Sequence, residues 1–402
     1  MHIRTFRIWY LIHKWTSLIC TVFLLLLCLT GLPLIFGHEI DHWLGNGVEA
    51  PELPADAGRV PVDRIVADAL ERRPGTAVRF VTADDEEPVW FVSLSSRDAP
   101  RQGGALLTYD ARTGDLLRDT PLRSGFMLIM VKLHTDLFAG LAGTLFLGFM
   151  GLLFVISIVS GIVVYGPLMK KLPFGTVRRE RSTRLKWLDL HNVLGMATLS
   201  WAFVVGLTGV LLTLAKPTYS FWQATELKAM VAPFAVRDGS SAAVAAPPDK
   251  LASLDAAIAL AKAEERDMTT AFVAFPGTPL AGNHHYAVFM RGDAHITSRL
   301  IKPVLIDAQT GAFAAKREMP WYVAALRISG PLHFGDYGAM PLKILWAILD
   351  VITIVLLGSG IYLWVGRTRT TNARLRKMED EQRSAERAAP AVAAVTQTGA
   401  SR

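Results

Sequence analysis

Four of the ten histidines fall at matching places in two halves of the chain. His13 is followed 17 residues later by a Thr-Gly pair, and so is His191. His134 and His333 each come directly after a leucine. Each is followed, at the same interval, by a Ser-Gly pair. The halves are offset by 178 residues at the first two histidines and by 199 at the other two. These spacings predict an internal repeat used twice in the same orientation.

If both halves cross a membrane, such a repeat predicts a pseudo-twofold axis along the membrane normal. Matched residues would then lie at equal depth, so His13 would face His191 and His134 would face His333. Two facing imidazoles inside a helical bundle suit the axial positions of a b-type haem, because neutral imidazole nitrogen is a preferred iron ligand. We therefore expect two haems b, an inner one held by the first pair and an outer one held by the second.

Other chemistry fits these residues less well. No Cys-x-x-Cys-His stretch occurs, which excludes covalent c-type haem attachment. Zinc is disfavoured because no third or fourth ligand lies near either histidine pair. No side chain is expected to act by acid–base catalysis, since the protein's part would be to hold and tune the cofactor. Both cysteines, Cys20 and Cys28, fall in one apolar run, where we expect small apolar fillers.

The elements that must position the histidines are apolar runs long enough to span a bilayer, which needs about 20 residues. There are four such runs: Leu18–Phe36, Leu141–Tyr165, Val193–Ala215 and Lys343–Trp364. Basic residues cluster before the first run, between the second and third, and after the fourth. By the positive-inside rule these clusters share one side, so both termini are expected in the cytoplasm. The net charge of +7 therefore predicts topology and not a nucleic-acid partner.

Residues between the first two spans and between the last two show the pattern of small α+β modules. Each segment contains an amphipathic helix, Val62–Arg72 or Leu251–Glu265, followed by alternating strand-like runs. Each also contains a strand ending in an Asp-x-x-Thr-Gly turn, at Asp110 and Asp307. The expected fold is membrane α-helical, with four transmembrane helices in two repeats and two α+β modules outside the cytoplasm.

In the first half we expect a transmembrane helix (1–38), a module (39–125), and a Leu-His segment with the second transmembrane helix (126–166). A basic cytoplasmic loop (167–190) leads to the second half, which has the third transmembrane helix (191–216), a second module (217–330), and a Leu-His segment with the fourth transmembrane helix (331–366). A disordered cytoplasmic tail (367–402) follows.

Two further residues are candidates. His38 lies 25 residues after His13, which returns it to nearly the same helix face. It could replace one member of the outer pair or relay electrons, and the alternative is an ordinary interfacial histidine. Asp350 is the only acid well inside a predicted span. An intramembrane carboxylate is costly, so we expect a polar partner or a proton role, with water exposure as the alternative. The remaining pair His284-His285 is expected to face solvent, as is His295.

Several segments resemble the PepSY-associated transmembrane family. They are His13-Lys14-Trp15, Leu29–Pro33, Leu133–Gly140, Asp189–Gly195 and Pro331–Gly335, and the resemblance extends from residue 1 to about 370. It implies a bacterial inner-membrane protein, often associated with iron uptake. Some members resemble haem-containing reductases that release iron from ferric siderophores in the periplasm, and others have no assigned activity. The Phe-Gly-Asp-Tyr-Gly stretch after His333 departs from the Thr-Gly start expected there.

The resulting interpretation is an inner-membrane haem oxidoreductase. It would take electrons from a cytoplasmic or membrane donor and reduce a ferric siderophore or similar ferric chelate in the periplasm. The alternative is a haem-free membrane scaffold whose modules bind or regulate a periplasmic partner such as a peptidase.

Overall fold

The computed structural model describes residues 2–45, 47–48, 50–54, 57–84, 87–97, 104–121, 125–169, 173–237, 251–293, 297–365 and 376–383. The chain divides into two compact units. We call the first the membrane unit (1–35, 132–213 and 340–402) and the second the sheet unit (36–131 and 214–339).

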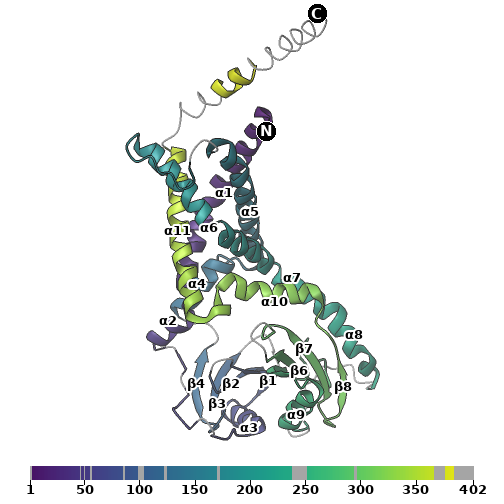
Figure 1. Ribbon diagram of the computed structural model, residues 1–402. Coiled ribbons are helices and arrows are strands. Elements are labelled where there is room, and N and C mark those ends of the chain that lie inside the picture. Colours follow the sequence, from purple (N-terminus) through teal and green to yellow (C-terminus); the bar gives the residue numbers. More distant parts are fainter. Residues whose placement is uncertain are drawn as a thin grey trace, which may run out of the picture. The chain divides into compact units, whose positions relative to one another are not determined.

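The membrane unit is built from four long apolar helices, each of 27 to 33 residues, so each exceeds the length needed to cross a bilayer. Their outward side chains are large and apolar, as at Val22, which is 66% exposed, and Ile348, which is 52% exposed. Such surfaces suit lipid contact. The helices include the four predicted spans, and the first begins well before its predicted start: α1 Ile3–Ile35, α5 Gly140–Met169, α6 Thr183–Thr213 and α11 Ala339–Val365 (Figure 1).

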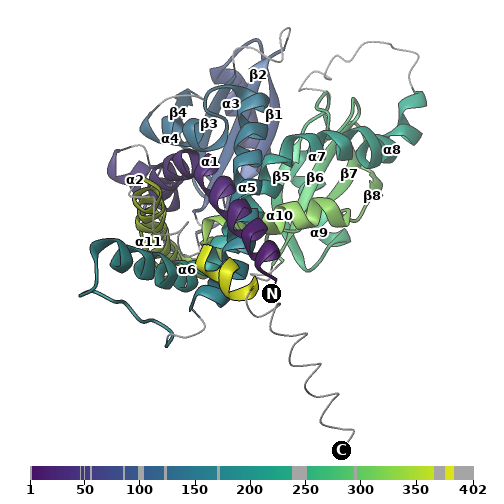
Figure 2. The ribbon, with the colours of Figure 1, turned by 90° about the horizontal axis from the view of Figure 1, so that it is seen from above.

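Small residues bring the membrane helices close together. At Gly148 of α5, an added Cβ would lie 2.4 Å from Thr213 Oγ1 of α6, and at Gly151 it would lie 3.1 Å from Val210 Cγ2. Helices in lipid associate through such close packing, because burial of apolar side chains gives no hydrophobic gain there. On the other side α5 lies beside α1 (Figure 2), where Met150 packs with Cys20 and Leu24.

The sheet unit contains one antiparallel sheet of eight strands in the order β4-β3-β2-β1-β5-β6-β7-β8. Four strands come from each half of the chain, and the halves join where β1 pairs with β5, with Val81 opposite Val273. The two predicted modules therefore share a continuous sheet, because pairing satisfies two edges that would otherwise expose backbone groups. The strands are β1 Thr76–Ala83, β2 Val89–Ser96, β3 Ala105–Asp110, β4 Leu116–Pro121, β5 Met268–Ala274, β6 His285–Gly292, β7 Ile301–Asp307 and β8 Phe313–Lys316.

The two predicted Asp-x-x-Thr-Gly turns join β3 to β4 and β7 to β8. Asp307 Oδ1 accepts hydrogen bonds from the backbone N–H groups of the two residues before Gly311, both at 2.9 Å, and Gly311 has φ 72°. Asp110 accepts from the backbone of Arg112 at 2.7 Å and pairs with its guanidinium. Burial alone would raise the pKa of Asp110, but these contacts hold it below its usual range. The turn chemistry predicted from sequence is present in both halves.

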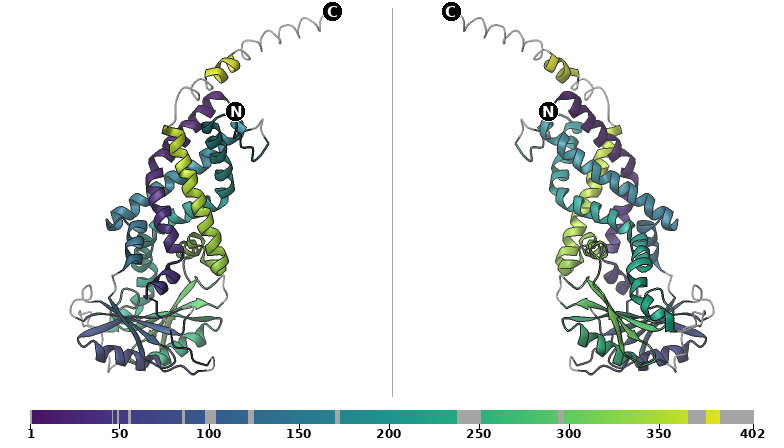
Figure 3. Two further views of the ribbon diagram at one scale, coloured as in Figure 1. Left: turned by 90° about the vertical axis from the view of Figure 1, so that its left-hand side faces the viewer. Right: turned by 90° about the vertical axis from the view of Figure 1, so that its right-hand side faces the viewer.

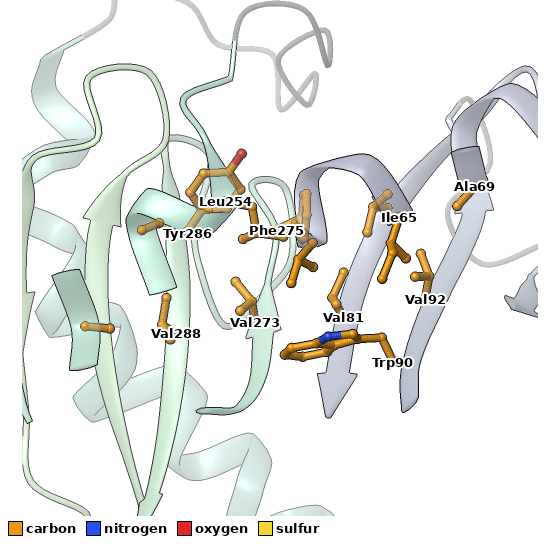
Figure 4. Close-up of a cluster of buried hydrophobic side chains, with 14 of the residues drawn as sticks. Ile65, Ala69, Val81, Trp90, Val92, Leu254, Val273, Phe275, Tyr286 and Val288 are labelled. Atoms are coloured by element: carbon orange, nitrogen blue, oxygen red, sulfur yellow. The ribbon is translucent and has the colours of Figure 1, made fainter. Parts of the chain in front are cut away.

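Two amphipathic helices, α3 Val62–Arg72 and α9 Leu254–Glu264, cover one face of the sheet (Figure 3). Their apolar residues pack with those of the central strands in one cluster that spans both halves (Figure 4). Ile65 and Leu254 come from the helices, and Trp90, Val273 and Val288 come from the strands. The cluster is therefore shared across the β1–β5 junction.

The amino ends of α3 and α9 cap each other. Asp255 accepts hydrogen bonds from the backbone N–H groups of Val62 and Asp63, both at 2.9 Å. Asp63 in turn accepts from the N–H of Leu254 at 2.7 Å and from Ser253 Oγ at 2.5 Å. The two aspartates are 192 residues apart, and each satisfies donors that begin the other's helix. The same contact is thus made in both directions.

The other face of the second half is covered by Trp222, Leu227 and Val323, which pack against Phe289 and Leu305. Further helical segments among the described residues include α2 Gly37–Trp43, α4 Phe126–Thr135, α7 Ala215–Trp222, a π-helix Gln223–Leu227, α8 Lys228–Val231, a 3-10 helix Ala232–Arg237, α10 Trp321–Phe334 and a 3-10 helix Asp336–Gly338.

Candidate functional site

His13 lies on α1 with its ring directed at α5. Its Nδ1 lies 2.9 Å from the backbone oxygen of Ser157. A carbonyl oxygen can only accept, so Nδ1 carries the hydrogen and, in the neutral ring, the lone pair is on Nε2. At Gly161 of α5, an added Cβ would lie 3.1 Å from the Cε1 atom of His13. The missing side chain at Gly161 therefore makes room for the ring.

His191 lies on α6 and makes the corresponding contacts with α11. Its Nδ1 lies 2.9 Å from Ser359 Oγ, and that hydroxyl donates to the backbone oxygen of Leu356 at 2.6 Å. A Cβ added at Gly360 would lie 3.6 Å from its Cε1. Leu356 and Gly360 follow Ser157 and Gly161 by the same interval of 199 residues that was predicted for this part of the chain.

His13 and His191 each make a described hydrogen bond through Nδ1. Both use Nδ1 for the hydrogen bonds described, which is how proteins commonly orient a histidine so that Nε2 can bind a metal. His13, His191 and the glycines beside them therefore fit the axial side of a haem site. The site would have two neutral donors on different helices, each ring is fixed by a hydrogen bond through Nδ1, and a glycine lies beside each ring.

His134 is the third candidate ring in the membrane unit. Its Nδ1 lies 3.1 Å from Thr30 Oγ1 of α1, and a Cβ added at Gly31 would lie 3.0 Å from its Cε1. The chain after this histidine has little freedom: Asp136 accepts a hydrogen bond from the N–H of Phe138 at 2.9 Å, and Phe138 has φ 59°. Non-glycine residues seldom adopt that conformation, and they cluster at functional sites.

The Thr-Gly and Ser-Gly pairs were used in the sequence only as markers of the repeat. The structure shows that three of the four pairs contact a histidine: Thr30-Gly31 holds His134, Gly161 lies against His13, and Ser359-Gly360 holds His191. Sequence reasoning missed this role. The signal was available, because each histidine recurs at a fixed distance from such a pair.

His333 and His38 belong to the sheet unit. His333 is in the last turn of α10, which ends at Gly335 with φ 78°, and its ring meets the edge of Phe334 with centroids 5.6 Å apart. His38 is in α2 and is exposed. His134 lies in the membrane unit, so its pairing with His333, or with His38, stays a prediction.

Two expectations for polar residues need correction. His285 was expected to face solvent, but it is 2% exposed and packs edge-on against Phe234 at 4.9 Å, because β6 has both faces covered. His284 is partly buried, and His295 lies outside the described residues. Cys28 was expected to be an apolar filler, and its thiol neighbours the carboxyl group of Asp350. Asp350 is 6% exposed, so water exposure does not explain it.

An ion pair not anticipated from the sequence holds the loop before α6. Arg178 donates to both carboxylate oxygens of Asp189, at 2.6 Å from Nη2 and 2.9 Å from Nε. Asp189 is fully buried and precedes His191 by two residues. A bidentate pair of this kind fixes geometry as well as charge, so Arg178 and Asp189 help to set the end of α6 that carries the histidine.

Four long apolar helices with a separate antiparallel sheet define a multi-pass membrane protein. The chain matches the PepSY-associated TM region over residues 10–367 and belongs to that family. It is also similar to a protein of Pseudomonas aeruginosa described as uncharacterized, with 29% identity over 83 residues. That match covers 21% of this chain and 21% of the relative, so the chain is matched to about a fifth of the relative's length.

Proposed function

We propose that the protein is a b-type haem oxidoreductase in which His13 and His191 are the axial ligands of an inner haem. The observation that carries the proposal is the equivalent support of the two rings. Each is anchored through Nδ1 on the next long helix of its own half, and each lies against a glycine. Interfacial histidines without a ligand have no need for this matched arrangement.

A bound haem would supply one-electron chemistry, its iron alternating between ferric and ferrous states. The chain's residues would hold and tune it. Ser157, Leu356 and Ser359 fix the imidazole tautomer and orientation, which raises ligand basicity. The apolar helices exclude water, and a drier environment shifts redox potential.

The contacts of His134 support a second, outer haem. Its ring is held by Thr30 and bordered by Gly31, as the inner rings are held by hydrogen-bonding groups and bordered by glycines. We propose His333 as its partner through the repeat, with His38 as the substitute if His333 is not a ligand. Two haems at different depths would carry electrons from one side of the bilayer to the other.

We further propose that the chain consists of two repeats, each with two spans and a PepSY-like module. The reciprocal caps of Asp63 and Asp255 support this, as does the pairing of Val81 with Val273 at the same separation of 192 residues. In this arrangement the protein lies in a bacterial inner membrane, with both termini in the cytoplasm and the sheet in the periplasm.

The proposed reaction is reduction of a ferric siderophore or similar ferric chelate in the periplasm. Haem held by His13, His191 and His134 would supply one-electron transfer from a cytoplasmic or membrane donor to the chelated iron, which would change from ferric to ferrous. Siderophores bind ferrous iron far more weakly, so the metal is released. Family membership motivates this substrate class.

Stopped-flow spectroscopy tests the substrate. Haem-loaded protein is reduced, mixed with ferric siderophores of several chemical classes, and followed at the haem bands. We expect reoxidation by at least one ferric siderophore, and none by the same siderophores loaded with gallium, which has the charge and size of ferric iron but is not reduced. Indifference to a broad ferric panel would favour the scaffold alternative, in which the modules bind or regulate a periplasmic partner.

A further inference from the structure

The middle of α11 carries a polar cluster that the haem proposal does not use. Asp350 is buried there, and Trp346 lies one turn earlier on the same helix face. Side chains on a helix lean toward its amino end, so the Asp350 carboxyl group extends toward the turn of Trp346. The Trp346 ring meets Trp201 of α6 edge-on, with centroids 6.4 Å apart.

Three polar atoms of this cluster are buried without a hydrogen-bond partner among the described residues. They are Oδ2 of Asp350 and the indole Nε1 atoms of Trp346 and Trp201. The other described contact of the carboxyl group is the Cys28 thiol of α1. Buried polar atoms are nearly always paired in native proteins, with protein or with ordered water. The acceptor on Asp350 lies one turn from Trp346, and the ring of Trp346 meets that of Trp201, so one acceptor and two donors on neighbouring side chains call for a small polar partner.

The cluster contains no positive charge to balance a carboxylate. Of the helices that meet α11 here, α1 presents Cys28 and α6 presents Trp201. Cys28 is the titratable side chain described beside Asp350; His191 is directed at Ser359, further along α11. A buried carboxyl group without a cation is far more stable neutral than ionised, so it binds a proton.

We infer that Asp350 is a proton-binding site in the middle of the membrane unit, and that a water molecule joins its carboxyl group to the indole N–H groups of Trp346 and Trp201. Water accepts two hydrogen bonds and donates two, and a buried water needs two to four polar partners. The cluster offers three.

The site lies near the inner histidines. Asp350 precedes Ser359, which holds His191, by nine residues, or about 13 Å along the helix. In a low-dielectric interior, charges interact strongly over that distance. An electron on the inner haem would therefore strengthen proton binding at Asp350. The proton would come from solvent and form an O–H bond with the carboxylate, and loss of the electron would weaken proton binding. This coupling rests on the proposed function, whereas the proton site itself does not.

Infrared difference spectroscopy of the haem-free protein in lipid nanodiscs tests the proton site. At neutral pH we expect the carbonyl band of a protonated carboxylic acid that shifts in D₂O and is lost in Asp350→Asn. Trp346→Phe keeps the ring but removes the N–H, so it should shift the band, whereas Trp364→Phe on the same helix should leave it unchanged. Absence of the band in the wild-type protein, or a band insensitive to Trp346→Phe, would overturn the inference.

Redox titration of the haem-loaded protein tests the coupling. The midpoint potential of the inner haem should fall as pH rises in the wild type, and the slope should flatten in Asp350→Asn. The same slope in both proteins would contradict coupling. Failure to bind haem would refute the proposed function while leaving the infrared result to decide the proton site.

Discussion

At the residue scale, what matters for each histidine is which ring nitrogen takes no part in its described hydrogen bonds, because that nitrogen is available to bind a metal. The carbonyl oxygen of Ser157 obliges His13 to keep its hydrogen on Nδ1. Ser359 Oγ donates its own hydrogen to the Leu356 carbonyl oxygen, so it accepts from Nδ1 of His191. Each neutral ring therefore offers Nε2 as a donor atom. A ring that was free to rotate would not be preorganised, and binding a metal would have to fix its orientation.

The glycines beside the rings give a prediction at this scale. Gly161→Val should push the His13 ring from its position, because even a Cβ would lie 3.1 Å from the ring. We expect loss of about half of the bound haem, measured by the pyridine haemochrome assay. Gly166→Val is the matched control on the same helix, since nothing lies within 4 Å of its added Cβ. Equal haem content in both variants would argue against a ligand role for His13.

At the element scale, the four spans and the two amphipathic helices were predictable, whereas α2, α4, α7, α8, α10 and the joining of the sheet were not. Helix α3 has the predicted bounds, Val62–Arg72, because amphipathic periodicity is a local property. The pairing of β1 with β5 joins residues nearly two hundred positions apart, and no local pattern reports such a contact. The short edge strands β4 and β8 were missed because they follow the predicted turns without a strong alternating pattern.

The reciprocal helix caps give a prediction at the element scale. Asp63→Ala or Asp255→Ala should remove a cap worth about 1 kcal/mol, which corresponds to about fivefold faster local opening. Each change should speed amide hydrogen exchange at the start of the opposite helix: α9 for Asp63 and α3 for Asp255. Glu71→Ala, an exposed position on α3, is the control. Faster exchange only in the mutated residue's own helix would contradict reciprocal capping.

At the scale of the whole molecule, the chain combines four membrane helices with a sheet contributed equally by both halves. The four-helix arrangement was predictable because spans of 20 apolar residues stand out in any sequence. Spacing matched His13 with His191, and the described contacts of the two rings correspond, while their pairing around one cofactor stays a prediction. Which rings flank one cofactor depends on helix packing, which periodicity does not encode.

Topology gives a prediction at this scale. A reporter fused after Arg376 should be active only if it is a cytoplasmic reporter, and one inserted near Asp238 only if it is a periplasmic reporter, because the basic clusters predict cytoplasmic termini. Alkaline phosphatase and green fluorescent protein distinguish the two sides. The opposite result at either position would overturn the four-span topology.

The central claim is that one haem iron is held between His13 and His191. The most direct measurement is haem stoichiometry, together with the reduced-state spectrum, for His13→Ala, His191→Ala and the double variant, with His284→Ala as the control. Because one remaining imidazole leaves the iron five-coordinate or lets the haem dissociate, each single change should cost nearly as much as both together. A purified wild-type protein that stays colourless when haem is supplied, or a low-spin spectrum that survives both single changes, would contradict the account.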